Sequence, residues 1–202
     1  MKLLKLSSSL LIMGLMGLIS VSASAQKIKL IEGDLSPLQG ETTISTKFTY
    51  DNMSVGKYDK ESDYIAKKTE EYNKKEPGRG DTWAKSWVSD RERTFEPKFI
   101  ELFERETAMT VSKKKPAKYT LIFKTLSTEP GYNVGIMRGN AYINAEIWIV
   151  ETATDKTIAK ISLQKAPGRS YGGYDFDTGG RIAECYADAG KYVGKFIKKK
   201  SK

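Results

Sequence analysis

Residues 140–165 read NAYINAEIWIVETATDKTIAKISLQK and contain the strongest structural pattern in the chain. Every second position in each half is apolar: Ala141, Ile143, Ala145, Ile147 and Ile149, then Ala159, Ile161 and Leu163. A period of two predicts strands with one buried face, and the short link TATDK predicts a hairpin between them.

The register of this hairpin follows from its apolar positions. Both apolar sets reach the same face only when odd positions pair with odd positions. The expected pairs are therefore Ile147–Ile161, Ala145–Leu163 and Trp148–Lys160. The third pair would bring an ammonium group next to an indole ring, which is a favourable cation–π contact.

Further strands and helices are predicted before the hairpin. KYTLIFKTL at 118–126 and TTISTKFTY at 42–50 alternate in the same way and predict two more strands. Residues 62–74 are polar and predict a helix, with Ser62 or Asp63 as its cap.

Pro97 divides the next helical region in the prediction. Proline is tolerated in a first helical turn but not in a helix interior. We therefore expect one helix at 82–94, capped by Asp81 or Thr82, and a separate helix at 97–107.

The C-terminal segment predicts an amphipathic helix. Its apolar residues recur at helical spacing: Ile182, Cys185, Tyr186, Ala189, Val193, Phe196 and Ile197. The other side is polar: Arg181, Glu184, Asp188, Lys191, Lys195 and Lys198. The predicted class is α+β: a single-domain two-layer α/β sandwich, with a mostly antiparallel sheet and the C-terminal helix packed on one face.

The first 25 residues have the pattern of a secretory signal peptide. Lys2 and Lys5 make a basic start, residues 10–21 are an apolar run too short to span a membrane, and Ala23 and Ala25 suit a cleavage site. We expect cleavage between Ala25 and Gln26. The mature protein would be one domain at 26–202, periplasmic or secreted, without a membrane span.

Composition argues against several classes of function. The chain has no histidine, which removes the commonest general base and zinc ligand, and its single cysteine permits no intrachain disulfide. Cys185 lies on the apolar side of the last helix, so we expect a buried hydrophobe rather than a reactive thiol. An exported chain without a nucleic-acid motif is not expected to bind nucleic acid. We expect no enzymatic activity, no cofactor and no metal.

The charge of the chain is strongly basic. The formal net charge is +9, and two of these charges belong to the predicted leader. Part of the excess lies in the lysine runs at 113–115 and 198–200. Such runs are typical of solvated surface, and they also suit attraction to an anionic envelope surface.

The half of the chain from Tyr119 to Ile197 resembles known exported proteins. The pattern is an apolar strand, Glu-Thr, a short turn and Lys-Thr-Ile, as in ETATDKTIAKI. It resembles uncharacterised exported proteins of Bacteroidetes-type bacteria. The element order also looks like the α/β domain shared by the amino-terminal part of the Tol-Pal translocation protein and the curli secretion lipoprotein; residues 27–110 match by element order alone. The resemblance implies protein–protein contact in the envelope.

The stretch YGGYDFDTGG at 171–180 admits several interpretations. Asp175 and Asp177 imitate the start of a calcium loop, for which Glu184 would supply a later ligand. A phosphate cradle would need the Gly-Lys-Ser/Thr signature, which is missing. Asp177 or Thr178 could instead cap the helix that follows, where acids suit the positive helix end.

Two glycine-rich loops are expected to meet at one edge of the sheet. If the three strands run up, down and up, the loops 127–139 and 166–180 leave from the same edge, where the last helix also starts. The residues that we expect on this partner-binding rim are Tyr132, Arg138, Arg169, Tyr171, Tyr174, Asp175, Phe176 and Asp177. Exposed tyrosines beside glycines suit recognition surfaces. The alternative is that the aromatic residues fold inward as a small satellite core.

Two classes of function therefore remain. The first is an exported periplasmic, non-enzymatic domain that binds a protein or glycan partner in the cell envelope. The second is a carboxylate-dependent hydrolase of envelope glycans that uses Asp175 with Asp177, or Glu146 with Glu151. The absence of histidine and of a complete catalytic set favours the first. The sequence indicates neither the identity of the ligand nor an oligomeric state.

Overall fold

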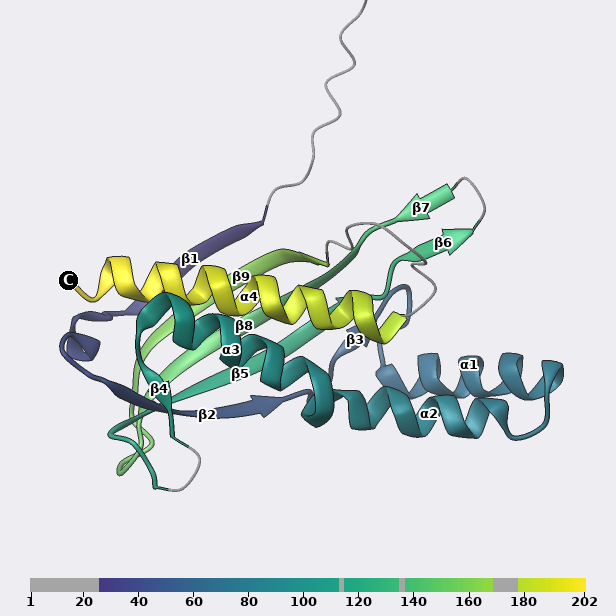
Figure 1. The fold of residues 1–202 in the computed structure, drawn as a ribbon, viewed down its shortest axis with the longest axis horizontal. Helices are drawn as coiled ribbons and strands as arrows, with labels where there is room; N and C mark the ends of the chain where they lie inside the picture. Colours follow the sequence, from purple (N-terminus) through teal and green to yellow (C-terminus); the bar gives the residue numbers. More distant parts are fainter. Residues whose placement is uncertain (1–25, 113–114, 135–136, 169–177) are drawn as a thin grey trace, which may run out of the picture.

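The computed structural model describes residues 26–112, 115–134, 137–168 and 178–202, and it contains one seven-stranded sheet with some of its helices packed on one face (Figure 1). The strands of this sheet are β1 (Lys27–Gly33), β2 (Thr43–Thr49), β3 (Ser54–Val55), β4 (Thr110–Val111), β5 (Tyr119–Glu129), β8 (Ala141–Glu151) and β9 (Thr157–Gly168). The helices are α1 (Glu61–Lys75), α2 (Arg79–Asp90), α3 (Glu96–Thr107) and α4 (Thr178–Lys200). The predicted α+β sandwich is confirmed, since α4 packs on the sheet and on α3.

The hairpin of β8 and β9 has the expected register. The paired residues include Ala145–Leu163, Ile147–Ile161 and Trp148–Lys160. Register shifts lie between Ile143 and Ala145 and between Ile149 and Val150, outside the central pairs. This register buries the apolar face of both strands. A shift by one residue would turn that face to solvent.

The sheet order is β1-β9-β8-β5-β2-β4, and β3 pairs with β5. The long strands β1, β9, β8 and β5 are antiparallel, whereas β2 runs parallel to both β5 and β4. Strand β1 was not predicted from the sequence; it is an edge strand with a register shift between Leu30 and Glu32. Two of its seven residues, Ile28 and Leu30, are half-buried and the other five are exposed, so the alternation along β1 is weak.

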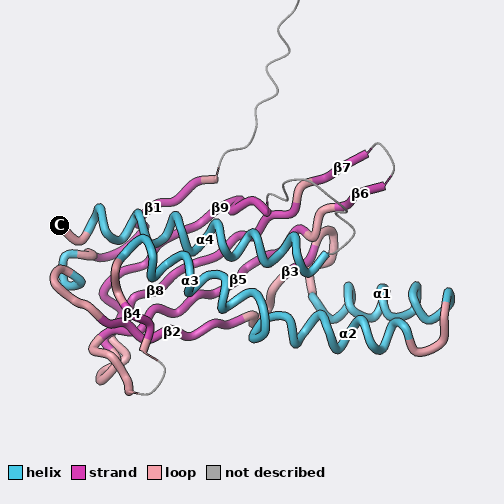
Figure 2. Tube along the Cα trace, viewed as in Figure 1, coloured by secondary structure: helices cyan, strands magenta, loops and turns pink. Residues whose placement is uncertain are grey.

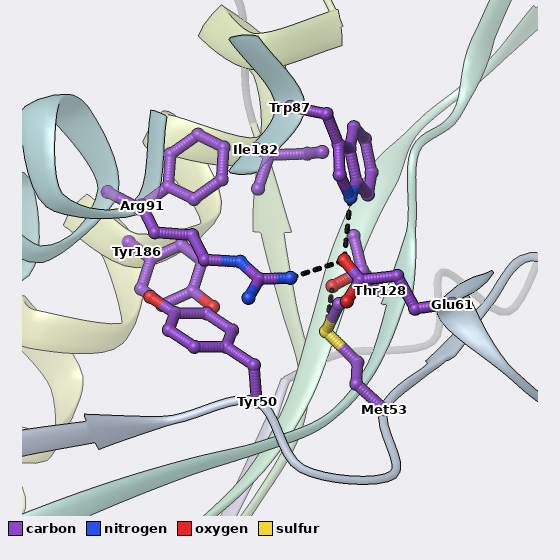
Figure 3. Close-up of a pocket in the computed structure, with 9 residues that line it drawn as sticks. Tyr50, Met53, Glu61, Trp87, Arg91, Thr128, Ile182 and Tyr186 are labelled. Atoms are coloured by element: carbon purple, nitrogen blue, oxygen red, sulfur yellow. Dashed lines mark hydrogen bonds and ion pairs between the residues drawn. The ribbon is translucent and has the colours of Figure 1, made fainter. Parts of the chain in front are cut away.

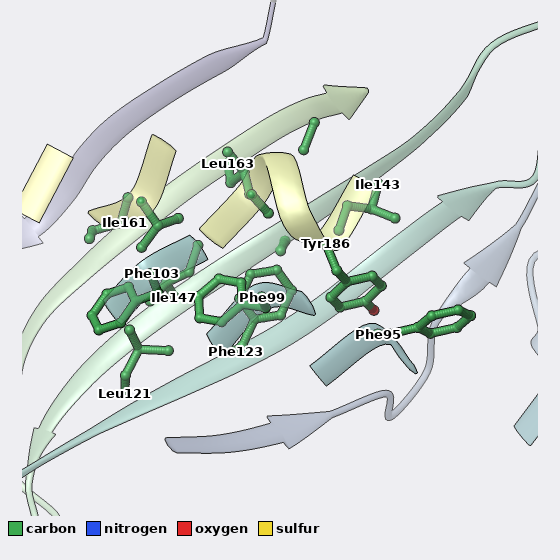
Figure 4. Close-up of a cluster of buried hydrophobic side chains, with 14 of the residues drawn as sticks. Phe95, Phe99, Phe103, Leu121, Phe123, Ile143, Ile147, Ile161, Leu163 and Tyr186 are labelled. Atoms are coloured by element: carbon green, nitrogen blue, oxygen red, sulfur yellow. The ribbon is translucent and has the colours of Figure 1, made fainter. Parts of the chain in front are cut away.

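The hydrophobic core lies between the sheet and the pair α3–α4 (Figure 4). Phe99 from α3, Phe123 from β5 and Tyr186 from α4 are buried at its centre. The ring centres of Phe99 and Phe123 lie 4.8 Å apart, and those of Phe123 and Tyr186 5.5 Å. The hydroxyl of Tyr186 forms a 2.6 Å hydrogen bond with that of Thr125, so this buried polar group is satisfied.

The two helices expected around Pro97 are confirmed as α2 and α3, although no non-helical break separates them. The chain stays helical from α2 into α3 through a π-helical segment at Arg91–Phe95, in which the backbone N–H of Glu96 donates to the carbonyl of Arg91. Pro97 falls in the first turn of α3, where no helical donor is required of it. The wider π turn thus lets α2 and α3 continue into each other with a bend (Figure 1).

The expected helix caps are wrong for α1 and α2. Helix α1 starts after Lys60 and has no side-chain cap. Helix α2 starts at Arg79, before Asp81 and Thr82, and the backbone N–H of Gly80 donates to Asn73 Oδ1 at 2.7 Å. The cap therefore comes from α1, which folds back against α2 (Figure 2).

The amphipathic pattern of α4 is confirmed with one exception. Its predicted apolar residues are buried or half-buried, Cys185 among them, and burial raises the pKa of that thiol. Arg181 was expected on the polar side, but it is only 6% exposed. Its Nε donates to the carbonyl of Pro130 at 3.1 Å, because the first turn of α4 lies against the end of β5.

Candidate functional site

A cleft of about 360 Å³ opens where the α1–α2 hairpin meets one edge of the sheet. We call it the tyrosine cleft. Its lining residues are Val55, Gly56, Lys57, Tyr58, Tyr64, Lys68, Tyr72, Glu129, Pro130, Gly131 and Thr178. They come from four separate parts of the chain, so the cleft exists only in the folded protein.

Helix α1 provides one wall of the tyrosine cleft. Tyr64, Lys68 and Tyr72 follow each other at intervals of four residues, which places them on one side of the helix. Rings from α2 support this wall: Trp83 lies 5.7 Å from Tyr72 and 5.8 Å from Tyr64, between ring centres. Burial, with Tyr72 and Glu129 nearby, raises the pKa of Tyr64, so this hydroxyl stays neutral.

The opposite wall is built from turns at the end of the sheet. Glu129, the last residue of β5, accepts a hydrogen bond from the backbone N–H of Gly131 at 3.1 Å. Gly131 has a φ of +66°, and a Cβ there would lie 2.4 Å from the carbonyl oxygen of Gly139. The turn therefore requires glycine. The Nζ atom of Lys57 lies 5.6 Å from the ring centre of Tyr58 and adds a positive charge to this wall of the tyrosine cleft.

The strand ends meet as the predicted rim requires. Glu129 of β5 pairs with Tyr142, and Ala141 pairs with Gly168, so the end of β5, the start of β8 and the end of β9 share one edge. The hydrogen bond from Arg181 to Pro130 joins the start of α4 to this edge.

The structure describes part of the predicted rim. Tyr132 is 52% exposed and lies in β6 (Tyr132–Val134), which pairs with β7 (Met137–Gly139). The backbone of Arg138 pairs with Asn133. The expected loop at 127–139 is thus the end of β5 followed by a small hairpin. The other rim residues lie outside the described residues, and their role stays a prediction: Arg169, Tyr171, Tyr174, Asp175, Phe176 and Asp177.

A partly buried ion pair holds the α1–α2 hairpin in place beside the cleft (Figure 3). Glu61, the first residue of α1, pairs with Arg91 and accepts a 2.6 Å hydrogen bond from the indole N–H of Trp87. The guanidinium of Arg91 lies 4.1 Å from the ring centre of Tyr50. The adjacent cavity of about 10 Å³ has room for about one water molecule, so we assign these residues a structural role.

Tyr50 and Glu96 form a second polar contact in this region. The Tyr50 hydroxyl donates to Glu96 Oε1 at 3.2 Å. Burial raises the pKa of Glu96 above its ordinary value, although the hydrogen bond from Tyr50 opposes the shift. Burial also raises the pKa of Tyr50, with Tyr186 and Glu96 adding to the effect. Both groups are therefore biased towards their neutral forms.

The carboxylates suggested for hydrolysis are separated or undescribed. Glu146 accepts a hydrogen bond from the Trp148 indole within β8, and Glu151 accepts one from the Thr154 hydroxyl in the turn after β8. Five residues along a strand correspond to roughly 16 Å, and odd and even positions point to opposite faces. Glycoside hydrolases need carboxylates about 5–9.5 Å apart, so Glu146 and Glu151 do not form such a pair.

The acidic residues are the candidates for metal binding in this chain. Within the described ranges, no group of three or more acidic or cysteine side chains is arranged to hold a metal ion. Asp175 and Asp177, the suggested calcium ligands and the other suggested catalytic pair, lie outside those ranges. Thr178, one of the two suggested caps, begins α4, and its hydroxyl accepts a 3.1 Å hydrogen bond from Arg181 Nη2.

The tyrosines of α1 are not among the site residues predicted from the sequence. The polar helix predicted at 62–74 is confirmed by α1, but the prediction does not include the side of the helix that carries Tyr64 and Tyr72. The signal was present, since Tyr64, Lys68 and Tyr72 recur at helical spacing just after Tyr58. What the sequence could not provide was the meeting of this helix with Glu129, which lies 57 residues beyond Tyr72.

No family model and no curated protein matches the chain. Similar solved structures include two crystal forms of the PelC dodecamer from Paraburkholderia phytofirmans. A substituted form in space group C2 aligns at a TM-score of 0.37 and 10% identity, covering 81% of this chain and 96% of that chain. The form in space group P6 aligns at 0.37 and 8%, covering 81% and 93%. The resemblances proposed from the sequence stay predictions.

Proposed function

We propose that the protein is an exported, non-enzymatic component of the cell envelope that binds a glycan in the tyrosine cleft. The observation behind this proposal is the lining of the cleft, where three tyrosines lie with two lysines and a glutamate. Aromatic rings stack on the C–H faces of sugar rings, and charged side chains form hydrogen bonds with sugar hydroxyls. The volume of about 360 Å³ falls within the usual range of ligand sites, about 300–1,000 Å³.

Binding is favoured over hydrolysis for this cleft. Its described lining includes a single carboxylate, Glu129, which already accepts a hydrogen bond from Gly131. Hydrolysis by the usual route needs a second carboxylate on the other side of the glycosidic bond. The facing wall instead presents Tyr64, Lys68 and Tyr72.

Export is supported by the leader pattern of the first 25 residues. We expect intact-mass measurement of the protein from the periplasm or medium to give a chain that starts at Gln26. Among the described helices, none has both the length and the apolar character to cross a bilayer. A retained leader, or an added lipid mass, would contradict the proposed route.

The glycan proposal can be tested by calorimetric titration. The ligands are soluble peptidoglycan fragments and neutral oligosaccharides, in a buffer that contains EDTA. Replacing Tyr72 by leucine removes the stacking ring but keeps an apolar contact with Trp83. We expect the affinity of Tyr72→Leu to fall at least about tenfold, since an aromatic contact contributes about 1–2 kcal/mol.

Tyr192→Leu is the matched control, because Tyr192 is an exposed tyrosine on α4 outside the tyrosine cleft. It should bind as the natural protein does. Absence of binding by every fragment, or equal binding by both variants, would refute the proposed site. Release of reducing ends from the fragments would favour the hydrolase, and capture of an envelope protein alone would favour a protein partner.

A further inference from the structure

The face of the sheet opposite α3 and α4 carries its own chemistry. Lys47, Ile122, Trp148, Lys160 and Glu32 form one row across β2, β5, β8, β9 and β1, each residue paired with the next. These positions alternate with the buried residues of the core, so their side chains lie on the outer face. Both packed helices lie on the other face (Figure 2).

A stack of Lys124, Trp148 and Lys160 occupies the middle of this outer face. The Nζ atoms of Lys124 and Lys160 lie 3.7 Å and 4.7 Å from the ring centre of Trp148. The indole N–H donates to Glu146 Oε2 at 2.9 Å, and Lys160 pairs with Glu32 at 2.6 Å. Trp148 is therefore held in a fixed orientation between two cations.

The outer face is basic across its whole width. Its charged side chains include the lysines Lys27, Lys29, Lys47, Lys124 and Lys160 and the glutamates Glu32 and Glu146. Among these side chains, the lysines outnumber the glutamates by three. Lys27, Lys29 and Lys47 are exposed, and none of them forms an ion pair with a described carboxylate. Their charge is available to an external anion.

Two large apolar side chains lie exposed at the bulges of the same sheet. Ile31 is 47% exposed at the irregularity of β1, and Leu126 is 45% exposed at that of β5. A dissolved anionic polymer would gain little from apolar groups, whereas a lipid surface offers both anionic headgroups and an apolar boundary. Trp148 has the amphipathic ring that is enriched at that boundary.

We propose that this outer face docks on an anionic phospholipid surface. The lysines contact the headgroups, and Ile31 and Leu126 reach the boundary beneath them. Attachment is peripheral and reversible, because it depends on surface charge and two apolar side chains. This inference is independent of the tyrosine cleft.

Vesicle sedimentation tests the inference. The natural mature protein is mixed with vesicles of phosphatidylcholine containing phosphatidylglycerol, and with vesicles of phosphatidylcholine alone. We expect binding to the anionic vesicles only, and a loss of binding as salt rises. In the double variant Lys29→Glu and Lys47→Glu the partition coefficient should fall at least about 25-fold, since each lysine near such a surface contributes about fivefold.

The control variant carries Lys195→Glu and Lys198→Glu, two exposed lysines of α4 with the same total change of charge. It should retain binding within about fivefold. An equal loss in both variants would show that net charge alone acts, which overturns the assigned face. If the natural protein does not bind anionic vesicles, the proposal is overturned. This holds even if the protein binds soluble polygalacturonate, an anionic polymer without lipid. Unchanged melting temperatures in both variants confirm that the comparison concerns binding.

Discussion

At the scale of single residues, Glu61 determines how the wall of the tyrosine cleft is placed. One oxygen accepts from Trp87 and pairs with Arg91, and both side chains of the ion pair are 17% exposed. Replacing Glu61 by alanine leaves the guanidinium largely buried without its anion, which costs about 3 kcal/mol of folding free energy. Urea denaturation should show this loss. Glu70→Ala removes an exposed pair on the same helix and should leave stability unchanged; equal losses would contradict the assigned role.

Glu96 makes the folding stability of the protein depend on pH. Its pKa is raised in the folded protein, mainly by burial, from an ordinary value of 4.5. The protonated Glu96 side chain therefore contributes fully to folding stability at pH values below its ordinary pKa. This contribution is lost as the pH rises through the raised pKa of the folded protein. Glu96→Gln keeps a neutral acceptor for the Tyr50 hydroxyl. Its melting temperature should match the natural protein in acid and exceed it at neutral pH, and a constant difference would disprove the assignment.

At the scale of elements, the contact of α3 with α4 depends on Gly190. A Cβ at this position would lie 2.2 Å from the backbone carbonyl oxygen of Phe99, whereas a Cβ at Gly194 would meet the Glu106 side chain at 3.0 Å. Gly190→Ala must separate the helices and should destabilise the protein by about 2 kcal/mol or more. Gly194→Ala should cost clearly less in the same denaturation experiment. The reverse order would refute this account of the packing.

Elements with a strong period were predictable from the sequence. Strands β8 and β9 and helix α4 each have one continuous apolar face. The period of that face indicates strand or helix, and in the hairpin it also determines the register. Elements governed by backbone geometry were not predictable in the same way. The π turn at Arg91–Phe95 and the cap of α2 by Asn73 depend on tertiary contacts, and Arg181 was misplaced because its partner, Pro130, comes from another element.

At the scale of the whole molecule, the helices divide the surface into two regions of different chemistry. The tyrosine cleft lies at the edge of the sheet beside α1, and the basic outer face lies on the side away from α3 and α4. The sequence predicted which strand ends share that edge and that Trp148 lies opposite Lys160. It could not predict the cleft, because α1 reaches the edge through contacts that are remote in sequence.

The two proposed surfaces should act independently, because no lining residue of the tyrosine cleft belongs to the row of Lys47, Ile122, Trp148, Lys160 and Glu32 on the outer face. Distant sites without shared partners contribute additively. Tyr72→Leu should therefore lose glycan binding while its partition onto anionic vesicles stays unchanged. The double variant Lys29→Glu and Lys47→Glu should show the opposite. Adding saturating glycan to the natural protein should leave the vesicle partition coefficient unaltered within about twofold. A larger shift would mean that glycan and lipid compete for one surface or are coupled through the sheet, since coupling between two ligands must act in both directions.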